Sequence, residues 1–407
     1  MSVRPQQVLQ MHTTHSPSFL GLHQNVGLWN ASNSGKGAII GVFDTGIAPQ
    51  HTSFNDNRMP SPPVKWKGKC EFNVTTYCNK KLIGARNFAQ LDKSQWDKDG
   101  HGTHTSSIAA GNFVDGANFL GNANGTAVGI APRAHVAIWC GCDFHVNGII
   151  VSPPLYDDYI AVGVYSVMEK GIFVSCSAGN DGPDKGSVVN EAPWILTVGA
   201  STTDRKIKAV TVWGNGAEFE GESAFQPTIF SRKLLPIVNG NVCELLNTSN
   251  VKGKIVLCET HGYRSGKDKV VVKMAGGVGM ILMNEKNLGS TTLSENDVLP
   301  TTNVDYNDEQ IIINYTKSTS TRVATISFKG TRTGNKHAQT VAYFSSRGLS
   351  MQSRGILKPD VIGPGVKILA AWSASVAAAI TSATAASSTF TFQTGASMSQ
   401  PEPGSWP

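Results

Sequence analysis

One stretch constrains this chain more than any other: Asp99-Gly100-His101-Gly102-Thr103-His104-Thr105, followed by a helix-like run. A histidine moves protons near neutral pH because its ordinary pKa is about 6.5. Glycines on both sides let the backbone turn and come close to a substrate. A histidine used in this way needs a carboxylate to hold its tautomer and a nucleophile to deprotonate. The stretch therefore predicts a catalytic site around His101.

The chain offers both partners at a distance in sequence. Residues 38–43 form a continuous apolar run that ends on Asp44, which is typical of a strand buried on both faces of a parallel sheet. Open α/β sheets place their sites at the carboxyl ends of such strands. Ser397 follows Gly395-Ala396 near the other end of the chain. Taken singly, Asp44 also fits a turn residue and Ser397 an ordinary loop hydroxyl.

A metal centre is the main alternative for the histidines. His101 and His104 have a spacing that zinc sites use, but no third ligand follows at a suitable distance. Cys140-Gly141-Cys142 lacks the second pair that a structural zinc site needs. We therefore predict neither a metal nor a cofactor, and we expect His104 to cap or pack the helix.

Residues 42–47, 99–105 and 395–399 resemble the three signature blocks of the plant subtilisin-like serine proteases (subtilases, peptidase family S8). Their order Asp, His, Ser is that of subtilisin. A fourth block, 177–183, resembles the one that carries the oxyanion-hole asparagine of the family, here Asn180. The resemblance covers about residues 13–399.

The resemblance implies a serine endopeptidase that acts on proteins or peptides. Asp44 would hold His101, and His101 would take the proton of Ser397 and deliver it to the leaving amine. Asn180 would donate to the developing oxyanion.

The resemblance also implies the fold class, an α/β fold with a subtilisin-like parallel sheet and helices on both faces, interrupted by a β-rich protease-associated (PA) domain. We expect the catalytic domain at residues 13–230 and 331–399 and the insert at 231–330. Residues 400–407 read as a tail outside the family pattern.

Two departures from the family pattern affect activity. Residues 140–151 are too few for a crossover helix and the further strand on whose edge a substrate lies. Pro401 and Pro403 should prevent the helix that the serine opens, which leaves Ser397 on a frayed, truncated end. We therefore expect little or no protease activity from the chain as written. A non-catalytic secreted glycoprotein that binds partners through the PA domain, and a truncated product without stable function, remain alternatives.

The 407 residues carry a net charge of only +6 and no repeated basic–aromatic platform, which argues against nucleic-acid binding. No apolar run reaches 18 residues, so we expect no membrane span.

The family resemblance implies an extracellular location, although residues 1–10 lack the apolar core of a signal peptide. Five Asn-x-Ser/Thr sequons agree with a secretory route: Asn30, Asn73, Asn124, Asn247 and Asn314. The sequence does not predict an oligomeric state.

The seven cysteines include two pairs that bracket short loops, Cys70 with Cys78 and Cys243 with Cys258. In an oxidising compartment each pair is a candidate disulfide. The alternative for each pair is two buried thiols.

Overall fold

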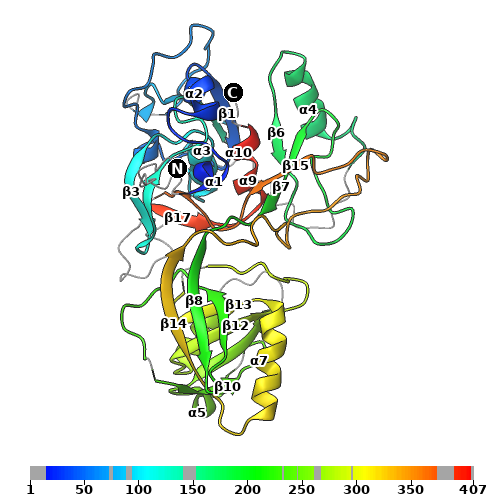
Figure 1. Ribbon diagram of the computed structural model, residues 1–407. Helices are drawn as coiled ribbons and strands as arrows, with labels where there is room; N and C mark the ends of the chain where they lie inside the picture. The colour runs from blue at the N-terminus through cyan, green and yellow to red at the C-terminus, as the bar shows by residue number, and fades with distance from the viewer. Residues whose placement is uncertain are drawn as a thin grey trace, which may run out of the picture. The chain divides into compact units, whose positions relative to one another are not determined.

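A computed structural model describes residues 15–72, 77–88, 94–140, 153–231, 233–244, 246–260, 267–294, 297–373 and 389–404. The chain divides into two compact units (Figure 1). The first takes in the described residues up to Asn180, Lys185–Ala200 and those from Ser346 onward. The second comprises Asp181–Asp184 and Ser201–Ser345.

The first unit contains a parallel sheet in the order β1-β5-β2. Its strands are β1 (Ile39–Asp44), β5 (His135–Cys140) and β2 (Leu82–Asn87). The central strand β5 is almost completely buried, whereas β1 alternates between half-buried and exposed positions. The sequence predicts that the strand ending at Asp44 is buried on both faces. In the structure β5 has that pattern, with paired neighbours on both sides, whereas β1 is an edge strand among the described residues.

A second three-stranded sheet of the same unit has the order β15-β7-β6. It consists of β15 (Val361–Pro364), β7 (Leu196–Ser201) and β6 (Ser175–Ser177), with β6 and β7 parallel. Helix α4 (Tyr159–Met168) precedes β6 and begins where the Asp158 carboxylate accepts from the backbone N–H groups of Ile160 and Ala161. These parallel strands and helices confirm the predicted α/β class.

Helix α3 (His101–Ala110) is the buried helix of the first unit, and after His101 every residue in it is buried. Glycine, threonine, serine and alanine make up most of its sequence, so neighbouring segments approach its backbone closely. The unit also has two antiparallel pairs: β3 (Val114–Phe119) with β4 (Asn122–Ala127), and β16 (Ile368–Ala371) with β17 (Phe390–Gln393). Its short helices are α1 (Ser16–Phe19), α2 (Gly27–Ala31), η1 (Asn33–Gly35), η2 (Thr52–Phe54), α9 (Ala396–Ser399) and α10 (Pro401–Gly404).

The second unit is a closed barrel in the order β10-β11-β12-β13-β9-β8-β14. Its strands are β8 (Lys206–Trp213), β9 (Glu218–Glu222), β10 (Leu235–Asn239), β11 (Ile255–Thr260), β12 (Gly279–Asn284), β13 (Thr301–Val304) and β14 (Val323–Arg332). Its helices are α5 (Thr248–Val251), α6 (Lys267–Met274) and α7 (Tyr306–Ser318).

The barrel extends beyond the insert expected at residues 231–330. Strands β8 and β9 lie before residue 231, yet β8 pairs with β14 and β9 pairs with β13. These two pairings close the barrel, so the compact unit begins at Ser201. No helix in the described part of the chain is long and apolar enough to cross a membrane.

Candidate active site

The acid and the histidine predicted from sequence meet in the structure. Asp44 is the last residue of β1, and His101 is the first residue of α3. The Nδ1 atom of His101 lies 2.6 Å from Oδ1 of Asp44. Since a carboxylate only accepts hydrogen bonds, Nδ1 carries the proton and donates it. This places the Nε2 lone pair of His101 where it can accept a proton, and the imidazole is 37% exposed.

Further donors hold the Asp44 carboxylate. Oδ2 accepts from the Thr105 hydroxyl at 2.9 Å, and Oδ1 accepts from the Thr45 N–H at 2.7 Å. Burial raises the pKa of Asp44, but the hydrogen bond and charge of His101, with the Thr45 and Thr105 bonds, bring the pKa below its ordinary value. Asp44 is therefore a fixed, ionised partner for the imidazole at neutral pH.

The same pair shifts the histidine in the opposite direction. Burial lowers the pKa of His101, but the hydrogen bond and charge of Asp44, and the charges of Asp99 and Asp97, raise it above its ordinary value overall. The arrangement thus stabilises the imidazolium that forms when His101 takes a proton.

The glycines beside His101 serve the packing of the chain on itself. A Cβ atom on Gly102 would lie 2.2 Å from the carbonyl oxygen of Gly46, in the loop that follows Asp44. Gly100 has a φ of 102°, in the left-handed region, immediately before the helix. We expected these glycines to admit a substrate; the close approach that the structure shows is instead between two segments that carry the site.

His104 is a packing residue, as the sequence predicts. Its Nε2 atom lies 3.1 Å from the Ile368 carbonyl and 3.3 Å from the Thr391 carbonyl. Burial lowers its pKa to about 3, so the ring is neutral. Within the described residues no group of three or more metal-binding side chains gathers.

Ser397 lies in α9, which contacts α3 on one side and β6 and β15 on the other (Figure 1). Its side chain is half-buried, and no hydrogen bond joins it to His101 in the described part of the chain. Its neighbour Met398 is buried against Ile108 of α3. Helix contacts thus bring the serine to the helix that carries the histidine.

The expectation that the prolines prevent a helix at the serine is wrong for the first turns. Two short helices form, α9 and then α10, and Pro401 is the first residue of the second. Proline is tolerated at that position because the first N–H groups of a helix have no partner within it. Ser397 is also not on a frayed end, since Ala396 and Met398 on either side are both buried.

Asn180 follows β6 and lies beside the start of the serine helix. Its Oδ1 atom accepts from the Ala396 N–H at 2.8 Å. This bond fixes the amide plane one residue before Ser397. The Nδ2 donors make no hydrogen bond within the described residues, and the residue is exposed. They are therefore free to meet a ligand oxygen.

Asp97 lies beside the histidine, and the sequence analysis does not select it as a site residue. Its carboxylate accepts from the Thr45 hydroxyl and from the first turn of α3. Asp97 lies four residues before His101, and this closeness in sequence is the only sign of it that the sequence offers. Its contact with Thr45 depends on the fold.

Strand β1 pairs with β5 alone, and β6 with β7 alone, in the part of the chain that the structure describes. Phe43 of β1 is 68% exposed and stacks on Trp139. The expected loss of a substrate-binding edge rests on residues 140–151, of which 141–151 lie outside the described residues.

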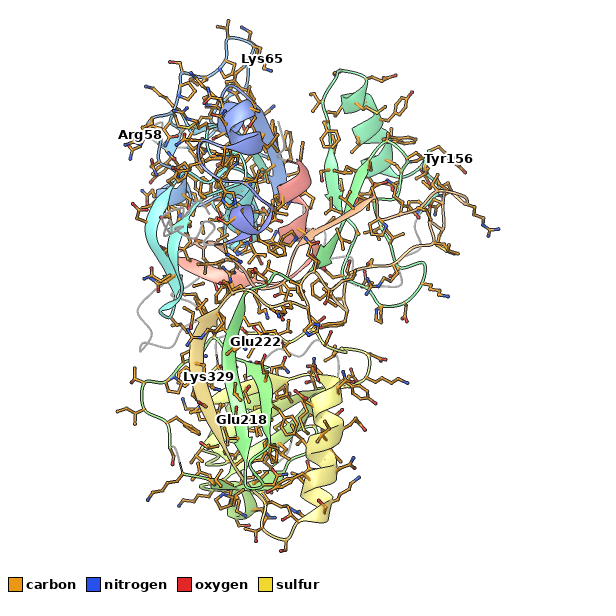
Figure 2. The ribbon with its side chains drawn as sticks, in the orientation of Figure 1. Arg58, Lys65, Tyr156, Glu218, Glu222 and Lys329 are labelled. Carbon is orange, nitrogen blue, oxygen red and sulfur yellow. A yellow bond between two sulfur atoms is a disulfide. The ribbon has the colours of Figure 1, made fainter. Side chains whose placement is uncertain are left out.

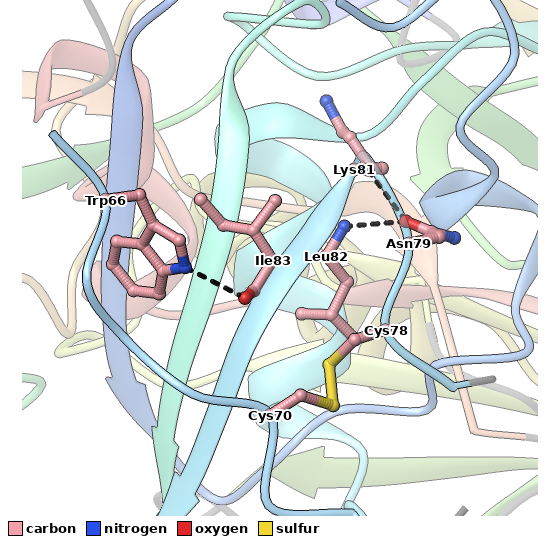
Figure 3. Close-up of a disulfide and its surroundings, with 7 residues drawn as sticks. All are labelled: Trp66, Cys70, Cys78, Asn79, Lys81, Leu82 and Ile83. Atoms are coloured by element: carbon pink, nitrogen blue, oxygen red, sulfur yellow. Dashed lines mark hydrogen bonds between the residues drawn. A yellow bond between two sulfur atoms is a disulfide. The ribbon is translucent and has the colours of Figure 1, made fainter. Parts of the chain in front are cut away.

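Both candidate cysteine pairs are disulfides in the structure, Cys70–Cys78 and Cys243–Cys258. Figure 3 shows Cys70–Cys78 beside β2, where the Asn79 side chain accepts from the N–H groups of Lys81 and Leu82. The disulfide and these bonds fix the entry to that strand.

The carboxylates labelled in the second unit have structural partners (Figure 2). Glu222 is buried and accepts from the Thr292 hydroxyl and the Ile207 N–H. Glu218 lies 3.6 Å from Lys329 on the exposed side of the barrel.

Comparisons with known proteins identify the family of this chain. The sequence profile of the subtilase family matches residues 35–145 and 151–402. Subtilisin-like protease SBT1.7 of Arabidopsis thaliana is 42% identical over 91% of this chain and 56% of its own length. Subtilisin-like protease SBT1.4 of the same plant is 40% identical over 92% of the chain and 55% of its own length.

A third relative, subtilisin-like protease SBT5.4 of Arabidopsis thaliana, is 36% identical over 98% of the chain and 59% of its own length. The chain thus spans somewhat more than half the length of the curated relatives it matches. The family matches cover the blocks that contain Asp44, His101, Asn180 and Ser397. The resemblance drawn from the sequence is confirmed, and the chain belongs to the subtilase family of serine proteases.

Proposed function

We propose that this protein is a serine endopeptidase that hydrolyses peptide bonds, with Ser397 as nucleophile, His101 as general base and Asp44 as the residue that orients the imidazole. The 2.6 Å contact between Nδ1 of His101 and Oδ1 of Asp44 carries the proposal. It sets the tautomer that leaves Nε2 as a base, which is the form a serine nucleophile requires.

The chemistry follows from these assignments. The Ser397 Oγ atom attacks the carbonyl carbon of the substrate while its proton passes to Nε2 of His101. The C–N bond then breaks as His101 returns that proton to the leaving amine, and an acyl-enzyme remains. Water then attacks the ester while His101 takes a proton from it. The bond between the acyl carbon and the Ser397 Oγ atom breaks as His101 returns this proton to Oγ, and the acid product departs.

Asn180 would stabilise the oxyanion formed in each attack. Its acceptor oxygen is occupied by the Ala396 N–H, so its amide donors point to the remaining side of the group. A donor fixed before the reaction stabilises developing charge without reorganisation at the moment of attack. Assignment of the amide oxygen and nitrogen follows from the hydrogen bond to Ala396.

The second unit, Ser201–Ser345 with Asp181–Asp184, is proposed as the PA domain of this protease. It would shape access of substrates rather than contribute to the reaction. An extracellular location is proposed with it, because disulfides such as Cys243–Cys258 persist in oxidising compartments. The four sequon asparagines in the described residues are all exposed: Asn30, Asn124, Asn247 and Asn314.

The test is casein hydrolysis by the purified chain and by His101→Ala and Ser397→Ala variants. One of the two reasons for expecting little activity no longer holds, because α9 and α10 form around Ser397. In subtilisin, loss of either residue lowers kcat by about 10⁶-fold, and we expect a loss of similar order here. Asp115→Asn is the matched control, because Asp115 is exposed on the β3–β4 pair, where its carboxylate accepts from the Thr126 hydroxyl. A folded chain whose activity equals that of both variants contradicts the proposal and favours a non-catalytic binding role.

A further inference from the structure

Asp97 is a buried carboxylate, 1% exposed, in the loop that leads into α3. It lies close to His101 in sequence, but among the described residues no hydrogen bond joins it to the imidazole. Five donors converge on it, and they come from three segments. They are the Asp99 N–H at 3.1 Å, the Gly100 N–H at 2.7 Å, the Thr103 N–H at 2.8 Å, the Thr103 hydroxyl at 2.6 Å and the Thr45 hydroxyl at 2.9 Å.

The need for such an acceptor follows from the start of the helix. The first N–H groups of any helix lack partners within it, and a side chain at the N-cap usually accepts from one of them. The N-cap of α3 is Gly100, which has no side chain to offer. Asp97 accepts from the third N–H group instead, at Thr103.

Two other side chains complete the cap. The Thr45 hydroxyl accepts from the Gly102 N–H at 2.9 Å, and Asp99 accepts from the His101 N–H at 3.2 Å. Thr45 in turn donates to Asp97. A single hydroxyl therefore joins the residue that follows Asp44 to the residue that follows His101, and Asp97 fixes its orientation.

The backbone joins the same two segments. The Asp97 N–H donates to the Ile47 carbonyl at 3.2 Å, and the Ile47 N–H donates to the Gln95 carbonyl at 3.2 Å. Gly46 precedes Ile47 in the same loop, and a Cβ atom on Gly46 would lie 2.9 Å from the Asp97 backbone nitrogen. The loop after β1 and the loop before α3 are thus locked together around one carboxylate.

We propose that Asp97 is a positioning residue of the active site, which holds the His101 imidazole against Asp44 by capping α3 and by orienting the Thr45 hydroxyl. This inference rests on the proposed roles of Asp44 and His101. Two carboxylate oxygens accept all five donors, and an amide in its place has one oxygen only. Asp97→Asn would place an N–H group against another donor, and the helix start would shift to relieve it.

The test reads the Asp44–His101 pair directly, so it does not depend on turnover. In Asp97→Asn, the NMR titration of the His101 ring should move to a lower pKa, because the charge of Asp97 helps to raise it together with Asp44 and Asp99. The downfield resonance of the Nδ1 proton should weaken, because the bond to Asp44 lengthens. Asp115→Asn should leave both signals unchanged. His101→Gln identifies the His101 signals.

Thr45→Val removes the connecting hydroxyl while it keeps the Asp97 charge. It should weaken the Nδ1 proton resonance with a smaller change in pKa than Asp97→Asn, which separates position from charge. Where casein hydrolysis is measured, both variants should lower kcat by about tenfold or more with little change in KM, since misplacement affects the chemical step.

Unchanged His101 signals in a folded Asp97→Asn protein contradict the proposal. Unfolding of both variants under conditions where Asp115→Asn stays folded also contradicts it, since Asp97 would then serve stability alone. Normal His101 signals in the parent chain without hydrolysis would instead contradict the proposed function.

Discussion

Asp44 and His101 lie 57 positions apart in the chain, yet their side chains meet at 2.6 Å at the end of a parallel strand and the start of a buried helix. Both groups depend on the contact, because each shifts the pKa of the other toward the charged form. The pair is therefore most stable as carboxylate and imidazolium, the state that follows proton transfer from a serine.

The pair should make stability depend on pH in two opposite ways. The lowered pKa of Asp44 contributes stability above the ordinary carboxyl range, and this is lost as pH falls through the folded value. The raised pKa of His101 contributes stability that is full below pH 6.5 and is lost as pH rises through the folded value.

Urea unfolding from pH 3 to 9 measures this effect. The difference in free energy of unfolding between the parent chain and His101→Gln should be largest between the ordinary pKa values of the two groups, 3.8 for the carboxyl and 6.5 for the imidazole. It should shrink toward both ends of the range. A difference that does not vary with pH would show that the contact does not couple the two ionisations.

Replacing Asn180 should affect catalysis rather than binding. Asn180→Asp keeps an acceptor for the Ala396 N–H but removes both amide donors. In subtilisin, loss of the corresponding donor costs about 10²–10³ in kcat, and we expect a loss of that order with KM nearly unchanged. Steady-state kinetics on a peptide substrate measure both. A large rise in KM with normal kcat would place Asn180 in substrate binding instead.

Lys81 should oppose folding at neutral pH. Its ammonium is fully buried and donates to the Pro132 and Ala134 carbonyls, both at 2.8 Å. Burial lowers its pKa from 10.5 to about 7. The unfolded chain therefore binds more protons between these values, and the free energy of unfolding should rise with pH over that range.

The matched comparison for this effect is Lys81→Met, which keeps a long flexible side chain without the charge. Thermal or urea unfolding between pH 7 and 10 should show a rise in the parent chain that the variant lacks. Parallel pH profiles for the two proteins would mean that the two carbonyls hold the ammonium charged across the range.

The local sequence predicts most of this site because each motif itself indicates the strand or helix that positions its residue. The apolar run before Asp44 indicates a strand, and the glycines around His101 indicate a tight entry to a helix. The contact between the two residues also depends on the strand pairing of β1 with β5, which no local pattern specifies.

The remaining features depend on contacts between distant segments. The proposed role of Asp97 depends on Thr45, 52 residues earlier, and the sequence around Asp97 does not reveal that partner. The helix turns around Ser397 form because Pro401 is the first residue of α10, where proline is tolerated, and because Met398 is buried in one apolar cluster with Ile108. The second unit takes in residues from Ser201 onward because β8, its first barrel strand, pairs with β14, more than a hundred residues later.

The most direct test of the proposed function is the reaction of a fluorophosphonate probe with the purified chain, located by peptide mass spectrometry. The probe modifies only a serine whose proton a nearby base removes. We predict labelling at Ser397 in the parent chain and in Asp115→Asn, and its loss in His101→Ala. Absence of label from Ser397 in the folded chain, or equal labelling in His101→Ala, would contradict the assignment of this site.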